Sequence, residues 1–339
     1  MRKLQSLLLS TIVFISACAG TGGQRNGQPD WVDGQSKRYP SELYLLGQGM
    51  AENLDDAKDR ARADLAKQFE VAINERSQQQ QQYSKLQQGE QSTESLQQNI
   101  SRQLVTQTTR TIQGIEIADT WHDQDKNQDH ALATLSRNKA RQQFQQQIEA
   151  LDEQSRQKLK QADTEQDALR KAALVQQAID KQLQRATAQS ALQVVDASGR
   201  GKPATLSLGE LLRTRDALIG RVKITAIAQG ALAEKLTPII SGNAATAGFQ
   251  ISATKRADYT LVAEAKLDPA FKQKNWHWLR GTLELRLIDG NNNDVGVKRW
   301  PLKAASVTVE QAEQRLLSDM DKILKNELRE TVLGFGGTD

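Results

Sequence analysis

Apolar residues in the first part of the chain switch between the spacing of strands and that of helices. A short apolar run at 43–46 ends in glycines at 47–49, which predicts a buried strand followed by a Gly-rich turn. Apolar residues then recur every three or four positions over 54–69, which predicts a helix capped by Asn53. Residues 71–75 are predicted to form the next strand.

The following segment is rich in glutamine and leads into a predicted hairpin. Glutamine dominates residues 76–99, and an i, i+4 spacing of apolar residues over 96–104 predicts a partner helix. Apolar and polar residues alternate at 115–121 and again at 131–135, on either side of a polar turn. This pattern predicts a β-hairpin.

After residue 136 the apolar spacing becomes helical over two long stretches. The first stretch covers residues 140–159, and Thr164 is predicted to cap the second, with Asp167 three residues later. Together they predict a helical hairpin, which ends before the polar, Gly-containing break SGRGKP at 198–203.

The C-terminal part combines helices with mostly antiparallel strands. Helices are predicted at 208–218, at 231–247 and after Thr308, and strands at 221–228, 249–253, 259–266, 278–288 and 295–302. The predicted fold class is α+β: a small N-terminal α+β domain, a long helical hairpin and a C-terminal α+β sandwich with a mostly antiparallel sheet.

The N-terminus has the pattern of a bacterial export signal. Two cations at positions 2 and 3 precede the apolar block LLLSTIVFI at 7–15, which is too short to span a bilayer. The block leads into ISAC, which resembles a lipobox; in such signals the cysteine, here Cys18, is lipidated and becomes the first mature residue. An ordinary signal peptide with a chance cysteine is the alternative. Ala19 after the cysteine is similar to signals that direct a lipoprotein to the outer membrane.

Composition narrows the possible partners. Cys18 is the only cysteine, so a lipidated chain has no thiol left for a disulfide. The formal net charge of +4 becomes +2 once Arg2 and Lys3 leave with the signal (+4 − 2). This charge is small, and acidic and basic residues are interleaved, so nucleic acid is not expected as a partner.

The stretch PDWVDG…SELYLLGQGMAENLDDAKDRARADLAKQF resembles the LPP-twenty family of bacterial lipoproteins. The pattern is a Pro-Trp opening, an apolar strand running into glycine, and a helix with regularly spaced alanines. The later GIEIADTWHD…HALATLSRNKA fits the strand pair of that family, so the likeness covers about 29–145. It implies an envelope lipoprotein, in some members linked to flagellar rings, without shared catalytic residues.

The C-terminal order of elements is similar to a periplasmic module of curli-secretion, flagellar H-ring and penicillin-binding-protein-activator lipoproteins. The predicted organisation therefore begins with a signal peptide (1–17) and a flexible tether (18–30). An LPP-twenty-like domain (31–136), a helical hairpin (137–197) and a C-terminal α+β domain (198–339) follow.

Enzymatic signatures are absent from the sequence, apart from two S-x-x-K matches that begin at Ser136 and Ser155. Both lie in polar helical sequence, and no K-T-G accompanies them. His122 and His130 could face each other across the predicted hairpin, but a zinc site needs more ligands. We therefore predict neither an enzyme nor a metal or cofactor.

The aromatic residues Trp121, Trp276 and Trp278, together with Arg280, are the candidate binding residues. Trp276 and Trp278 are two positions apart on a predicted strand and so share one face. They could be core or domain-interface residues, or an exposed strip that contacts a partner or a glycan.

The sequence thus predicts a protein held in the outer membrane by acylated Cys18, with its body facing the periplasm. Exposure at the cell surface is the alternative. We expect a non-enzymatic binding or scaffold module whose partner is an envelope protein, in a flagellar ring, a secretion system or cell-wall synthesis. The alternative function is binding of peptidoglycan, and a second copy of the chain is a further candidate partner.

Overall fold

The computed structural model describes residues 27–88, 114–252 and 257–337. The predicted signal peptide, Cys18 and the predicted helix at 96–104 lie outside these residues. The chain forms two compact units: one comprises Met1–Leu65 and Ile115–Leu135, and the other comprises Ala66–Gly114 and Ser136–Asp339.

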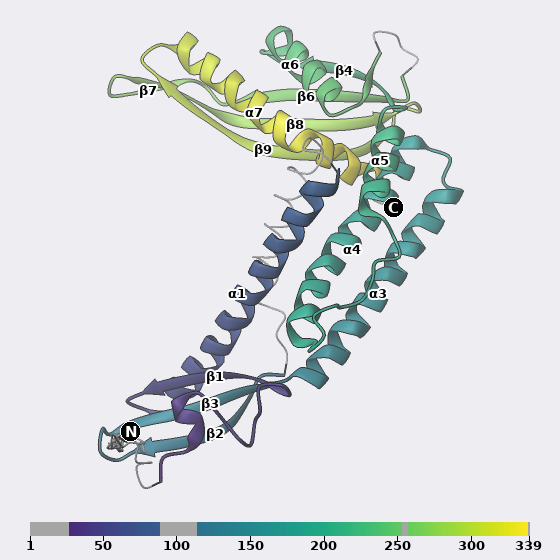
Figure 1. Ribbon diagram of the computed structural model, residues 1–339. Coiled ribbons are helices and arrows are strands. Elements are labelled where there is room, and N and C mark those ends of the chain that lie inside the picture. Colours follow the sequence, from purple (N-terminus) through teal and green to yellow (C-terminus); the bar gives the residue numbers. More distant parts are fainter. Residues whose placement is uncertain (1–26, 89–113, 253–256, 338–339) are drawn as a thin grey trace, which may run out of the picture. The chain divides into compact units, whose positions relative to one another are not determined.

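The first unit is a small three-stranded sheet with one helix (Figure 1). Its elements are the 3-10 helix η1 (Asp30–Asp33), β1 (Tyr44–Ala51), the start of α1 (Leu54–Gln88), β2 (Glu116–Asp123) and β3 (Gln128–Ser136). The strand order is β1-β3-β2, and the antiparallel pairing of β2 with β3 confirms the predicted hairpin. The buried Trp31 donates its Nε1–H to Asp119 Oδ2 over 2.9 Å and so holds η1 against β2.

Two glycines of β1 allow α1 to pack directly on the strand. Gly47 and Gly49 lie inside β1, so the predicted Gly-rich turn is wrong. A Cβ on Gly47 would lie 2.5 Å from Leu65 Cβ, and one on Gly49 would lie 2.0 Å from the carbonyl oxygen of Ala57. Only a residue without a side chain fits here, because the helix backbone occupies that space.

α1 is longer than its sequence pattern predicts. Asn53 caps it as predicted, since its Oδ1 accepts a hydrogen bond from the backbone N–H three residues later over 2.9 Å. The predicted strand at 71–75 is wrong, because the buried stripe of the helix continues through Phe69 and Ile73. Phe69 stacks on Phe144 with ring centroids 6.1 Å apart, which stabilises this part of the helix.

The second unit contains the predicted helical hairpin, made of α3 (Arg137–Thr164) and α4 (Ala168–Val195). Thr164 does not cap α4, contrary to the prediction, because its hydroxyl donates back into α3, to Gln161 O. Asp167 is the cap instead, and its Oδ1 accepts the backbone N–H of Arg170 over 2.8 Å.

A buried ion pair connects the two helices of the hairpin. Asp152 of α3 and Arg185 of α4 are each 4% exposed, and Arg185 Nε donates to Asp152 Oδ1 over 2.9 Å. The same guanidinium donates to the carbonyls of Lys202 and Pro203 over 2.9 and 2.8 Å, and Gln182 donates to Asp152 over 3.1 Å. Arg185 therefore fixes both the register of the hairpin and the segment that follows it.

The rest of the second unit is a six-stranded sheet with three helices. In chain order the elements are α5 (Leu208–Ile219), β4 (Lys223–Gln229), α6 (Ala233–Thr246), β5 (Gln250–Ile251), β6 (Tyr259–Leu267), β7 (Phe271–Gln273), β8 (Trp276–Asp289), β9 (Asp294–Ser306) and α7 (Val309–Gly336). β4 pairs in parallel with β5 and β6, whereas β6, β7 and β9 all pair antiparallel with β8. The predicted α+β class with a mostly antiparallel sheet is confirmed.

One apolar core joins this sheet to the helical hairpin. Leu169, Val175 and Ile179 of α4 belong to the same buried cluster as the leucines of β8 and the inner face of α7. α6 and α7 contact each other and cover the face of the sheet that contributes to this core (Figure 1). The opposite face of the sheet carries the candidate site.

Candidate functional site

Side chains along β8 point alternately toward α6 and α7 and away from them. Leu283, Leu285 and Leu287 are buried toward the helices, so the even-numbered residues lie on the other face. The middle of that face holds one buried carboxylate, and its end holds an aromatic cluster.

Glu284 pairs with the cations in the middle of this face. It is 4% exposed and accepts hydrogen bonds from Arg299 Nε over 2.6 Å and from Lys266 Nζ over 3.0 Å, with Arg286 Nε at 3.7 Å. The hydrogen bond from Arg299, followed by that from Lys266, lowers the pKa of the Glu284 carboxyl below its usual value. The cations in this part of the face therefore have a carboxylate partner.

The end of the same face carries four residues that we call the aromatic–cation stack: Phe271, Trp278, Arg280 and Lys303. Phe271 of β7 pairs with Trp278 of β8, and their rings are nearly parallel with centroids 6.4 Å apart. Arg280 Cζ lies 5.0 Å from the Phe271 centroid and 5.8 Å from that of Trp278, and Lys303 Nζ lies 5.0 Å from the Trp278 centroid. These are cation–π distances.

The two cations of the stack are directly opposite each other in the β8–β9 register. Like charges in that position repel. Within the part of the chain that the structure describes, neither Arg280 nor Lys303 has an ion pair with a carboxylate. The stack is thus a positive, partly exposed surface, whereas the cations around Glu284 are paired with a carboxylate.

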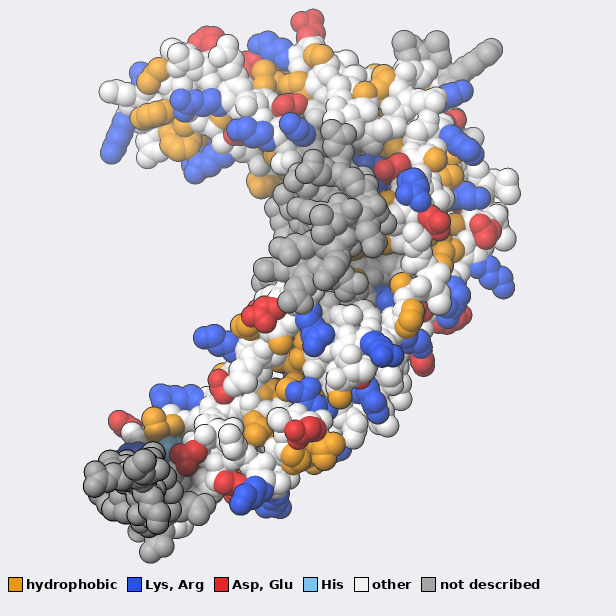
Figure 2. Space-filling model, in the orientation of Figure 1, with side chains coloured by type: hydrophobic (Ala, Val, Ile, Leu, Met, Phe, Trp, Pro, Cys, Tyr) orange, Lys and Arg blue, Asp and Glu red, His pale blue; other side chains and the backbone are white. Residues whose placement is uncertain are grey.

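Apolar side chains are exposed around the stack. Phe271 is 38% exposed and Trp276 is 43% exposed, and Val307, which follows directly after β9, is 57% exposed. Figure 2 shows hydrophobic side chains with Lys and Arg around them at the β7 end of the sheet. An exposed apolar group surrounded by cations is typical of a recognition surface.

The structure places three of the four predicted binding residues at this surface. Trp276, Trp278 and Arg280 share one face of β8. Trp121 belongs to the other compact unit, on β2, where its ring lies 5.1 Å from that of His130. Sequence reasoning missed Phe271 and Lys303; only the register of β8 with its neighbours reveals them.

The two S-x-x-K serines have structural roles. Ser136 caps α3, and the hydroxyl of Ser155 is buried and donates to Leu151 O over 3.0 Å. His122 and His130 do not face each other: His122 Nδ1 lies 2.9 Å from Asp129 Oδ1, whereas His130 is buried. Burial lowers the pKa of His130.

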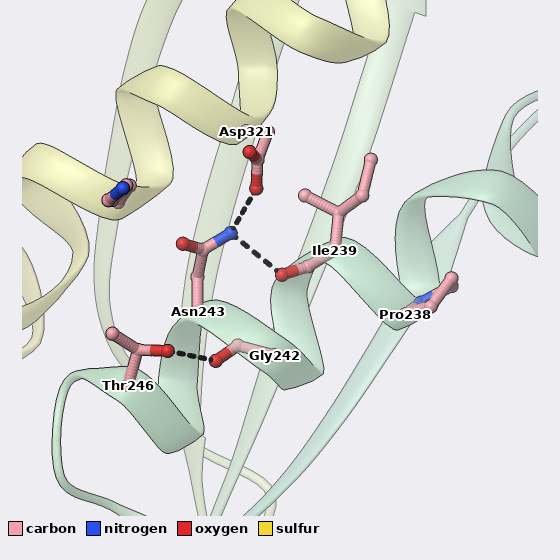
Figure 3. Close-up of a pocket in the computed structure, with 7 residues that line it drawn as sticks. Pro238, Ile239, Gly242, Asn243, Thr246 and Asp321 are labelled. Carbon is pink, nitrogen blue, oxygen red and sulfur yellow. Dashed lines mark hydrogen bonds between the residues drawn. The ribbon is translucent and has the colours of Figure 1, made fainter.

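The pocket between α6 and α7 is lined by apolar residues such as Pro238 and Ile239 as well as by polar ones (Figure 3). Asn243 Nδ2 donates to Asp321 Oδ1 of α7 over 2.7 Å and to Ile239 O of its own helix over 2.9 Å, so one of its amide hydrogens joins α6 to α7. The described residues contain no group of three or more His, Cys, Asp or Glu side chains that could hold a metal ion.

Residues 29–136 match the LPP20 lipoprotein family. This match confirms the family resemblance predicted for this part of the chain. Among the described residues, no helix has the length and apolar character needed to cross a membrane. No curated protein matches the sequence.

Several solved structures are similar to parts of the chain. The secreted protein HP1454 from Helicobacter pylori shows 12% identity and a TM-score of 0.44, over 83% of this chain and 96% of that one. A minor lipoprotein from Acinetobacter baumannii shows 15% identity and a TM-score of 0.27, over 32% and 92%. A putative lipoprotein from Caulobacter crescentus CB15 shows 17% identity and a TM-score of 0.24, over 33% and 87%.

Proposed function

We propose that this lipoprotein is anchored in the outer membrane through acylated Cys18 and acts in the periplasm as a non-enzymatic binding or scaffold module of envelope assembly. The observation that carries the proposal is the aromatic–cation stack, a positive and partly exposed surface with two cations that lack carboxylate partners among the described residues. Such a surface binds a ligand through charge and aromatic contacts and needs no catalytic group.

The proposed mechanism is local concentration. The acyl chains confine the protein to one membrane surface, and the Gly-rich tether at 18–30 lets the folded units search for a partner nearby. Each 28-residue helix of the hairpin is about 40 Å long at 1.5 Å per residue, which extends the distance over which the protein can contact a partner. The favoured partner is an envelope protein of a flagellar ring, a secretion system or the cell-wall synthesis machinery.

The anchor predicts a simple fractionation result. Cys18→Ser removes the only thiol that can be acylated, so the protein should move from the membrane fraction to the soluble periplasmic fraction. Separation of membranes after osmotic lysis measures this, with the unaltered chain as the control. If the Cys18→Ser chain is exported and still sediments fully with membranes after a high-salt wash, which releases proteins held by charge, the proposed anchor is wrong.

The recognition surface is tested by photo-crosslinking in intact cells. A photoreactive amino acid at position 303 should trap one envelope protein, because Lys303 is exposed and belongs to the stack. The same group at position 160, on the exposed side of α3, is the matched control and should trap none. Identical adducts from the two positions would contradict a specific surface at the stack.

The alternative function, binding of peptidoglycan, is favoured by the composition of the stack. A glycan strand offers apolar sugar faces to Phe271 and Trp278, and its stem peptides offer carboxylates to Arg280 and Lys303. A muropeptide adduct in the crosslinking experiment, in place of a protein adduct, would support this alternative over the protein partner.

A further inference from the structure

The tip between β7 and β8 has a composition that the proposed function does not explain. Its sequence, FKQKNW at 271–276, places two lysines between two aromatic residues, and all six residues are exposed. Lys274 has a φ of 55°, which reverses the chain so that the tip projects beyond the sheet.

The tip is strongly positive for its size. Lys272 and Lys274 lie in the tip itself, and Arg280 and Lys303 lie beside it in the aromatic–cation stack. The segment 268–280 contributes only one carboxylate, that of Asp268. Among the residues that the structure describes, no ion pair involves any of these four cations.

The tip is also apolar at its two ends. Phe271 and Trp276 are 38% and 43% exposed, and the exposed Val307 and Val309 follow Ser306, which pairs with His277 next to the tip. Aromatic residues at the end of a projecting loop, with lysines between them, match the chemistry of a membrane interface. There the rings occupy the headgroup region and the cations contact acidic lipids.

We infer that the β7–β8 tip docks on the surface of a bilayer that contains anionic phospholipid. The charge favours this occupant, because acidic headgroups complement four cations that have no ion pair among the described residues and that lie beside exposed aromatic side chains. Lipid docking goes beyond the proposed function, since it would give the protein a membrane contact independent of its acyl anchor.

The test uses the whole mature chain with Cys18→Ser, so that acyl chains cannot hold the protein on lipid. This protein should sediment with vesicles of phosphatidylglycerol and phosphatidylcholine, should not sediment with phosphatidylcholine alone, and should be released at high salt. Lys272→Gln/Lys274→Gln should weaken binding about 25-fold, at about fivefold per charge near the surface. Trp276→Ala should weaken it about tenfold through lost apolar contact.

The control variant is Lys160→Gln/Lys322→Gln, which removes two exposed cations of the same unit away from the tip and should bind like the parent. Equal binding to both vesicle types, no binding to the acidic vesicles, or full binding by the tip variants would each overturn the inference. Retention on purified sacculi that requires Lys272 and Lys274, without vesicle binding, would overturn it in favour of the cell wall. Because the Cys18 fractionation is scored after a high-salt wash, failure of lipid docking leaves the proposed anchor standing, whereas retention on sacculi would also support the peptidoglycan alternative.

Discussion

Arg185→Met is expected to lower the free energy of unfolding of the second unit by about 3–5 kcal/mol, because it leaves the Asp152 carboxylate buried without its cation. The carbonyls of Lys202 and Pro203 lose their donor in the same variant, so the segment after α4 is also released. Urea denaturation followed by circular dichroism measures the change.

Two further variants distinguish the cost of breaking the buried ion pair from the cost of losing any one positive charge. Arg156→Met removes an exposed arginine of α3 that pairs with Glu153, and should cost at most about 1 kcal/mol. Asp152→Leu/Arg185→Met removes both buried charges and should recover much of the loss. A cost for Arg185→Met no larger than that of Arg156→Met would show that the buried pair does not stabilise the hairpin.

Gly49→Ala is expected to destabilise the first unit by about 3 kcal/mol or more, the upper end of the cost of overpacking. The added Cβ would lie 2.0 Å from the Ala57 carbonyl oxygen and 2.3 Å from the Ala61 nitrogen, both backbone atoms that cannot move without shifting α1. Faster amide hydrogen exchange in β1 and β3, with α6 unchanged, would be the measured result.

The matched control for this prediction is Gly242→Ala in α6. A Cβ at Gly242 meets no atom within 4 Å, so alanine should stabilise the helix by about 0.5–1 kcal/mol. If the two substitutions had similar effects, close approach of α1 would not be the reason for glycine at position 49.

Local signals in the sequence predicted the helices well, and contacts between distant segments explain the errors around α1. Asn53 caps α1 as expected, since capping depends only on the next few residues. Gly47 and Gly49 predicted a turn, because the sequence does not reveal that a helix lies on that strand. The predicted strand at 71–75 failed for the same reason: Phe69 finds its partner, Phe144, in another helix.

The candidate site was predictable only along a single strand. The alternation of Trp276, Trp278 and Arg280 placed them on one face from the sequence alone. Phe271 and Lys303 come from β7 and β9, and only the pairing of those strands with β8 brings them to the same rings. Asp152 and Arg185 are likewise far apart in sequence, and no local motif around either residue predicts the buried pair.

The apolar core that α4 shares with the C-terminal sheet has a practical consequence for anyone who dissects this protein. A chain that starts after the hairpin, near residue 198, would lack Leu169, Val175 and Ile179, which fill the core beside α5 and α7. The fragment would expose the matching apolar surface to water and would tend to aggregate. Fragments intended for binding studies should therefore begin before α3, so that the hairpin and the sheet are purified together.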